Sequence, residues 1–137
     1  MAKFLEWSNA YSVGMQRLDD DHRHLLDLVS QAMESIINRD PPKRVARRID
    51  EIVSDTRRHF ADEERLMERT SYRNLGPHRA EHQALLEQIS KALADHARGA
   101  ISAVDLSTAL AHWLLDHIVQ SDKPLAEHLN RSGVEAE

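Results

Sequence analysis

Seven side chains in this sequence have types and spacings that suit a metal centre. Five are histidines and two are carboxylates: His22, His59, Glu63, His78, His82, His117 and Asp122. Imidazole and carboxylate ligands without sulfur suit iron, manganese or zinc. Seven side chains exceed the four ligands of a structural zinc site. The set therefore predicts two metal ions that share carboxylate bridges.

The spacing of these residues indicates that they face one another. His59 and Glu63 are four residues apart, and so are His78 and His82. On a helix this spacing places two side chains on the same face, about one turn apart. A single inward histidine is more often a hydrogen-bonded core residue than a ligand. The metal prediction therefore depends on the whole set, which interrupts apolar stripes where a buried polar group needs a partner.

Apolar residues recur at helical spacing in four segments. We expect helices over about 19–38, 43–70, 77–98 and 102–123, the last with Ser102 and Asp105 as a capping pair and an end before Pro124. Short connections favour an antiparallel, up-down-up-down four-helix bundle, which is an all-α fold. That topology brings all seven candidates to one end of the bundle. His117 and Asp122, five residues apart, meet there if Asp122 faces inward where its helix ends.

The rest of the chain is expected to cover this bundle. Residues 1–137 form one domain, with an irregular N-terminal arm over 1–17, the bundle over 18–122 and a C-terminal tail over 123–137. The apolar residues of the arm are expected to pack over the bundle. Within the tail, residues 125–131 are expected to form a short extra turn.

Composition narrows the classes of protein. The chain contains no cysteine, which excludes disulfides, zinc-thiolate sites, iron–sulfur clusters and thiol nucleophiles. The formal charge of -5 argues against nucleic-acid binding. No apolar run is long enough for a signal peptide or a membrane span. We therefore expect a cytoplasmic protein that is not embedded in a membrane.

Five stretches, taken in order, resemble the bacterial members of the haemerythrin family. They cover nearly the whole chain and contain every candidate ligand: 7–14 (Trp7, Tyr11-Ser12-Val13-Gly14), 18–25 (Leu-Asp-Asp-Asp-His-Arg-His-Leu), 59–67 (His-Phe-Ala-Asp-Glu-Glu-Arg-Leu-Met), 78–82 (His-Arg-Ala-Glu-His) and 113–122 (Trp-Leu-Leu-Asp-His-Ile-Val-Gln-Ser-Asp). The resemblance implies two non-haem iron ions with an oxo or hydroxo bridge. It also implies reversible O2 binding by a monomer that is not an enzyme.

The resemblance also implies a role for each candidate. One iron would bind three histidines (His78, His82 and His117), and the other would bind two (His22 and His59). Glu63 and Asp122 would bridge the ions, and O2 would bind at an open position of the two-histidine iron. The wall of the O2 pocket would be formed by Trp113, Leu114 and Ile118.

Other functions are compatible with a buried metal centre of this composition. O2 sensing through a separate partner, delivery to an oxygen-consuming enzyme, iron storage, and di-iron oxidase or peroxidase activity remain open. The ferritin-like Glu-x-x-His pair does not occur in the sequence, which counts against that class of enzyme. The four other histidines are expected to be exposed or peripheral: His24, His96, His112 and His128. Three carboxylates beside ligands are expected to point away from the site: Asp62, Glu64 and Glu81.

Overall fold

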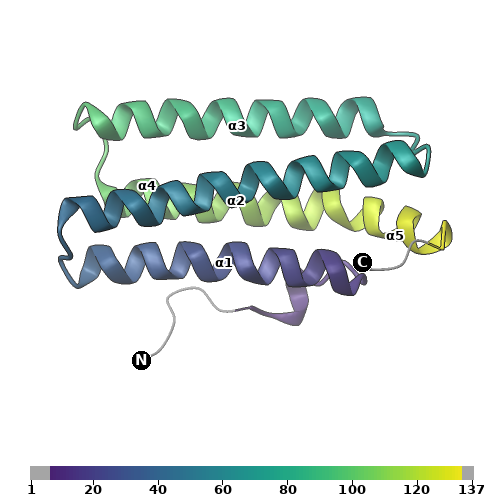
Figure 1. Cartoon of the computed structure of the whole chain (residues 1–137), viewed down its shortest axis with the longest axis horizontal. Helices are drawn as coiled ribbons and strands as arrows, with labels where there is room; N and C mark the ends of the chain where they lie inside the picture. The colour runs from purple at the N-terminus through teal and green to yellow at the C-terminus, as the bar shows by residue number, and fades with distance from the viewer. Residues whose placement is uncertain (1–6, 134–137) are drawn as a thin grey trace.

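Four long antiparallel helices form the protein in the computed structural model, which describes residues 7–133 (Figure 1). They are α1 (Gln16–Ile37), α2 (Pro42–Arg69), α3 (Leu75–Ala97) and α4 (Ala103–His117). The loops α1–α2 and α3–α4 lie at one end of the bundle, and the loop α2–α3 lies at the other. The described residues contain no strand. The expected all-α, up-down-up-down bundle is confirmed.

The ends of these helices follow from local sequence. Ser102 accepts a hydrogen bond from the backbone N–H of Asp105 at 3.0 Å, so the expected cap of α4 is present. Gly99 follows α3 with φ +77°, a conformation that glycine adopts without strain. The expected start of α3 at Pro77 was wrong by two residues, because the helix begins at Leu75. Proline is accepted there since N–H groups of a first turn have no partner within the helix.

The end of the fourth helix differs from the prediction that Pro124 would stop it. The chain continues from α4 into a π-helical turn, η2 (Ile118–Asp122), and then into α5 (Lys123–Arg131). Pro124 lies in the first turn of α5, where its missing N–H is not needed. A π turn bonds residue i to i+5, so His117 and Asp122 come to the same face. The unusual five-residue spacing is therefore matched by an unusual turn.

The N-terminal arm and α5 close one end of the bundle. The short 3-10 helix η1 (Asn9–Tyr11) precedes α1, and the carboxylate of Asp19 accepts hydrogen bonds from Ser12 Oγ (2.6 Å) and Val13 N (2.8 Å). The expectation that the arm packs over the bundle holds for the described part. Residues 1–6 of the arm and 134–137 of the tail lie outside the described residues. In place of a single turn, α5 is a nine-residue helix that buries Leu125 and Leu129 completely.

Two apolar clusters fill the interior. We call the larger the central core; it takes residues from all four long helices and includes Val29, Ile52, Ile89 and Leu106. We call the smaller the cap core; its members come from the arm, the adjoining helix ends and α5: Val13, Met15, Leu18, Leu66, Met67, Ile118, Leu125, Ala126 and Leu129. Members of these clusters flank the candidate ligands along the chain, and Asp122 lies between two members of the cap core, Ile118 and Leu125. A buried polar layer is thus enclosed by apolar side chains on both sides.

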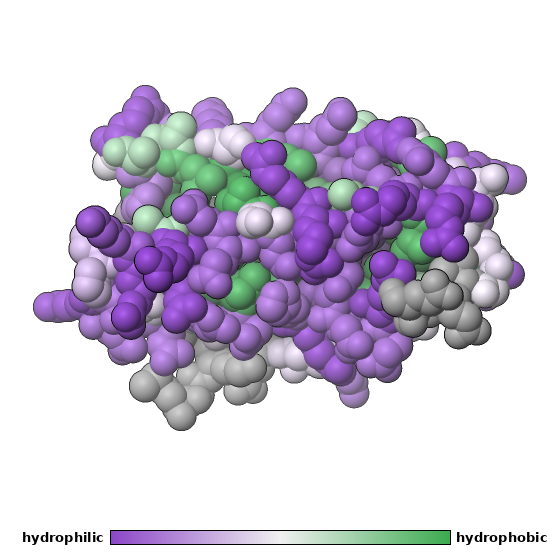
Figure 2. Space-filling view, in the orientation of Figure 1, coloured by the Kyte–Doolittle hydropathy of each residue, from purple (hydrophilic) through white to green (hydrophobic). Residues whose placement is uncertain are grey.

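The outer surface is mainly polar, as Figure 2 shows for one face. An apolar hollow on that face lies over the part of the bundle away from the cap core; it is lined by residues of α1, α2, α3 and α4, among them Val45, Ile49 and Leu93. No helix within residues 7–133 combines the length and the apolar character needed to cross a membrane.

Candidate metal centre

All seven candidate residues meet in the buried polar layer. The histidines come from α1 (His22), α2 (His59), α3 (His78 and His82) and α4 (His117). Glu63 comes from α2 and Asp122 from the last position of η2. Each of the seven residues is at most 6 % exposed. The sequence prediction that they lie together at one end of the bundle therefore agrees with the geometry.

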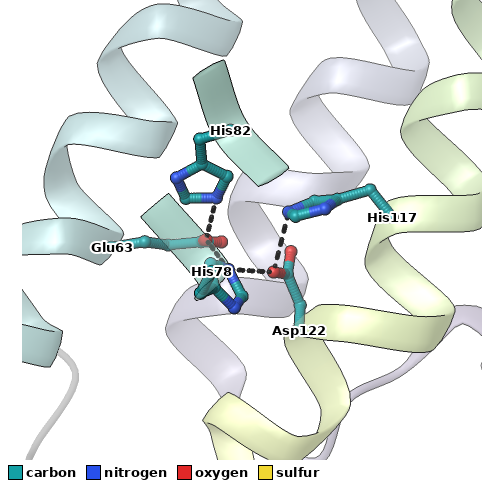
Figure 3. A group of neighbouring side chains, drawn as sticks. All are labelled: Glu63, His78, His82, His117 and Asp122. Carbon is teal, nitrogen blue, oxygen red and sulfur yellow. Dashed lines mark hydrogen bonds and ion pairs between the residues drawn. The ribbon is translucent and has the colours of Figure 1, made fainter. Parts of the chain in front are cut away.

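Three of the histidines surround one side of the two carboxylates (Figure 3). The Nε2 atoms of His78 and His82 lie 3.2 Å and 3.0 Å from Glu63 Oε1. His78 Nε2 is also 3.2 Å from Asp122 Oδ1, and His117 Nε2 is 3.1 Å from the same oxygen. These five residues can offer one ligand atom each with all atoms within 4.8 Å of one another.

The other two histidines approach the same carboxylates from the opposite oxygens. His59 Nε2 lies 2.6 Å from Glu63 Oε2, and His22 Nε2 lies 2.9 Å from Asp122 Oδ2. The two Nε2 atoms are 3.1 Å apart. These four residues form a second group whose ligand atoms lie within 4.8 Å of one another. Glu63 and Asp122 belong to both groups, which is the arrangement that two ions with shared carboxylates require.

The hydrogen-bond inventory supports a cation in this layer. Several buried atoms that face the centre lie close to other candidate ligand atoms but make no hydrogen bond of good geometry with the described residues: Glu63 Oε2, His82 Nε2, His117 Nε2 and both oxygens of Asp122. A buried polar atom without a partner costs about 1–3 kcal/mol. Since nitrogen and oxygen atoms without hydrogen bonds converge on two shared carboxylates, the donor set fits a pair of divalent or trivalent cations without sulfur ligands.

The pKa shifts in the metal-free layer also indicate a site that needs positive charge. Burial lowers the pKa of His59, but Glu63, Asp122 and Asp21 raise it well above its ordinary value. For His78, burial is likewise outweighed by Asp122 and Glu63, and its pKa is raised to about 9. Burial raises the pKa of Glu63 and Asp122, yet the histidines hold both well below the ordinary range. Protons on the histidines thus take the place of cations in the metal-free layer.

Three further carboxylates hold the histidines from outside. His59 Nδ1 lies 3.1 Å from Asp21 Oδ2, and His82 Nδ1 lies 3.0 Å from Glu64 Oε2. His117 Nδ1 lies 3.4 Å from Glu81 Oε1. A carboxylate on Nδ1 fixes the tautomer so that Nε2 can face a metal, and it raises the basicity of that nitrogen.

Sequence reasoning missed these three residues. Glu64 and Glu81 do point away from the ligand face of their own helices, but they meet histidines on neighbouring helices. Asp21 directly precedes His22 and was given no role of its own in the sequence analysis. The available signal was an acidic residue beside a ligand in each case. Asp62, in contrast, pairs with Arg58 and Arg65 and has no contact with a candidate ligand.

The residues expected to line an O2 pocket are divided between the clusters. Leu114 belongs to the central core and Ile118 to the cap core, and both are 2 % exposed. Trp113 packs against the central core and also lines a surface hollow between α3 and α4 beside His117. Phe60, which sequence reasoning did not single out, stacks on the ring of His82 with centroids 3.8 Å apart. Apolar side chains therefore border the layer on the central-core side.

The remaining histidines lie outside the layer, as expected. His24 and His112 are exposed. His96 Nδ1 lies 3.1 Å from the backbone carbonyl of Ile101, and His128 Nε2 lies 2.9 Å from Thr70 Oγ1. Both of these side chains are half-buried and belong to helix ends.

Comparison with known proteins finds one family along nearly the whole chain. The family described as "Hemerythrin HHE cation binding domain" matches residues 13–129. A bacteriohemerythrin of Stenotrophomonas maltophilia is 28 % identical, covering 93 % of this chain and 85 % of the relative. A myohemerythrin of Sipunculus nudus is 26 % identical, covering 85 % and 86 %.

Solved structures share the fold. A wild-type hemerythrin crystal structure superposes with a TM-score of 0.82 at 22 % identity, covering 92 % of this chain and 98 % of the other. At that identity the superposition speaks for the fold alone. The family match, in contrast, spans both carboxylates and all five histidines of the buried layer. The chain belongs to the hemerythrin HHE cation-binding family.

Proposed function

We propose that this protein binds O2 reversibly at two non-haem iron ions, as a carrier or store that can supply oxygen-consuming enzymes. The observation that carries the proposal is the division of the buried layer into a three-histidine group and a two-histidine group that share Glu63 and Asp122. Family membership and the relatives named bacteriohemerythrin and myohemerythrin support iron and O2 as the metal and the ligand.

In this proposal each side chain has a defined task. Nε2 atoms of His78, His82 and His117 would hold one ion, and those of His22 and His59 the other. Glu63 and Asp122 would bridge them, each offering one oxygen to either side. The smaller ligand set on the two-histidine side leaves room for O2 there. Two neighbouring ferrous ions, when bound, supply the electrons that O2 takes up on binding and returns on release.

The protein encloses the layer in apolar side chains. Leu114 and Ile118 lie on either side of His117 in sequence and are nearly completely buried. Phe60 covers the ring of His82, and the cap core covers the other side of the layer. Exclusion of water and protons favours release of O2 in its original form over irreversible oxidation of the metal. The enclosure of the polar layer between two apolar clusters therefore suits a carrier better than an enzyme that must admit substrates.

The direct test is the visible spectrum of iron-loaded protein. The protein is reduced without air, exposed to O2 and then returned to an O2-free gas. We expect a visible band that appears with O2 and disappears when O2 is removed, and metal analysis should find two irons per chain. Direct conversion to a stable ferric form would contradict reversible binding and favour an oxidase. One zinc per chain would contradict the di-iron centre.

A variant pair makes this test specific to the layer. His59→Ala removes a ligand from the two-histidine group and should abolish the O2-dependent band. His112→Ala removes an exposed histidine of α4 and should leave the band unchanged. Equal spectra for the two variants would contradict the assignment of O2 to the two-histidine side.

A further inference from the structure

Three candidate ligand histidines are held in the same three-part way. In each case, Nδ1 of the histidine faces a carboxylate on the preceding long helix of the bundle. A second donor, on the histidine's own helix or its direct continuation, binds the same carboxylate. We call each such set a relay.

The first two relays use arginine as the second donor. In one, His59 of α2 faces Asp21 of α1, and Arg58 Nη2 lies 3.7 Å from Asp21 Oδ1. In the other, His82 of α3 faces Glu64 of α2, and Arg79 Nε donates to Glu64 Oε1 at 3.1 Å. Both arginines have further carboxylate partners, so each is held in place itself.

The third relay uses a hydroxyl group. His117 of α4 faces Glu81 of α3, and Ser121 in η2 donates to Glu81 Oε1. The π turn that brings Asp122 to the centre therefore also brings Ser121 to Glu81. The other two candidate ligand histidines, His22 and His78, have no such relay among the described residues. His22 lies on the first long helix, which no long helix precedes. Its Nδ1 is buried without a hydrogen-bond partner among residues 7–133.

The second donor matters because the three carboxylates are partly open to water. The side chains of Asp21 and Glu64 are 21 % and 26 % exposed, and that of Glu81 is 51 % exposed. A carboxylate held only by a histidine can rotate toward water and leave the imidazole free to turn. A second, charge-assisted donor from the histidine's own helix restrains it. The histidine then keeps Nε2 aimed into the layer.

We propose that Arg58, Arg79 and Ser121 are positioning residues that set how firmly each half of the centre retains its metal ion. Arg58 acts on the two-histidine half through Asp21 and His59. The other two residues act on the three-histidine half through Glu64 and Glu81. This inference rests on the two-metal centre proposed above. Each half contains one histidine without a relay, His22 or His78, but the two-histidine half has one relay and the three-histidine half has two. The ion of the two-histidine half is therefore the first to be lost.

The test is the rate at which a ferrous chelator removes iron. Anaerobic Fe2+-loaded protein is mixed with an excess of a coloured chelator, and release should occur in two phases of one ion each. Loss of a carboxylate that orients a ligand weakens metal binding by about 10–100-fold, so Asp21→Asn should speed the fast phase by that order. Arg58→Gln should speed the same phase by a smaller factor, about threefold to tenfold, because it removes only one of the two restraints on Asp21.

The effect should be confined to one half of the centre. Arg79→Gln should speed the slow phase and leave the fast phase unchanged, and Ser121→Ala should do so more weakly. Arg57→Gln is the matched control, because Arg57 is exposed and has no ion pair or hydrogen bond within the described part of the chain. If Arg58→Gln leaves the fast phase unchanged or slows it, the proposal is wrong.

A double-variant cycle separates positioning from a general loss of stability. If Arg58 acts through Asp21, Arg58→Gln should have no further effect on the fast phase in the Asp21→Asn background. A full effect in that background would overturn the proposal. Arg58→Lys should restore part of the wild-type rate, since it keeps a cation beside Asp21. Unfolding of the metal-free variants by urea gives the purely structural contribution of each arginine.

The metal content of the wild-type protein shows whether the proposed centre is wrong or only the positioning inference. If the wild-type chain does not bind two irons, the proposed centre fails. If it binds two irons in two phases and the arginine variants match the Arg57→Gln control, only the positioning inference fails.

Discussion

The buried layer of histidines and the central core lie in the same four helices, but the layer consists of ionisable side chains and the core of apolar ones. In the central core, large apolar side chains such as Ile52 and Leu106 are completely buried. About two and three helical turns further along the same helix as Ile52, His59 and Glu63 are just as buried. Burial is therefore equal in the two regions, and only the need for a partner differs.

This difference indicates what each region contributes. The central core is satisfied by contacts within the chain and should form with or without metal. The polar layer has buried atoms without partners and like-charged groups close together, so it is stable only with protons or metal ions present. The central core thus stabilises the fold, whereas the layer needs bound metal ions or protons to be stable. Four predictions test this contrast, beginning with the largest effect.

Removal of both irons should destabilise the layer and leave the central core folded. A ligand present at about 1,000 times its Kd stabilises the folded state by about 4 kcal/mol, so each tightly held ion is worth that much. We expect a lower melting temperature without iron. Amide hydrogen exchange should increase mainly in the first turns of α1 and α3, the end of α2, η2 and α5. Uniform exchange along all four helices would contradict the separation of the two regions.

Loss of a single ligand should remove one ion and about half of that stabilisation. His59→Ala should retain the ion of the three-histidine group, whereas His82→Ala should retain the other one or lose both. Iron analysis after gel filtration gives the stoichiometry, and thermal unfolding gives the stability. Equal retention of both ions in His59→Ala would contradict the division into three and two histidines.

Truncation of a side chain in the central core should lower stability without changing the iron content. Leu106→Ala removes a completely buried side chain and should cost about 2–5 kcal/mol of unfolding free energy. Iron content should remain at two per folded chain, since Leu106 lies three turns before His117 on α4. Val104→Ala, at a side chain that is 51 % exposed, is the control and should change stability by less than about 0.5 kcal/mol. Loss of iron in Leu106→Ala would show that the two regions are coupled.

The residues of the layer could be predicted because a polar residue in an apolar stripe is visible in one helix at a time. His59, Glu63, His78 and His82 each interrupt such a stripe at a spacing of four. The bundle topology then brings the four helices together without further information. For the same reason the fold class could be predicted, since short loops leave few arrangements for four amphipathic helices.

The outer carboxylates and the π turn could not be predicted in this way. Asp21, Glu64 and Glu81 act on histidines of another helix, so their role depends on the rotation and register of two helices. Helical periodicity within one helix does not contain that information. The five-residue gap between His117 and Asp122 was a signal for a π turn, but Pro124 favoured an ordinary helix end. Leu125 and Leu129, four apart, were the signal for α5.

The smallest of the four effects is expected from protonation. The stability of the metal-free protein should depend on pH through the histidines of the layer, whereas the central core contributes no such dependence. Burial alone would lower the pKa of His78, but Asp122 and Glu63 raise it from 6.5 to about 9 in the metal-free protein. A raised pKa in the folded state contributes stability that is complete below pH 6.5 and is lost as pH rises through 9. Metal binding must displace the same proton, so iron affinity should increase over this range.

Urea unfolding of metal-free protein between pH 6 and 9.5 measures this loss, and iron competition with a chelator measures the gain. The matched variant is His112→Ala, which should keep the wild-type dependence on pH because His112 is exposed. His78→Gln should reduce this dependence, because a neutral amide cannot gain or lose the proton, and the other layer histidines with raised pKa values should keep the remainder. If metal-free wild-type protein is equally stable at pH 6 and 9.5, the histidines of the layer do not replace the metal as its cations, and the contrast with the central core loses its electrostatic basis.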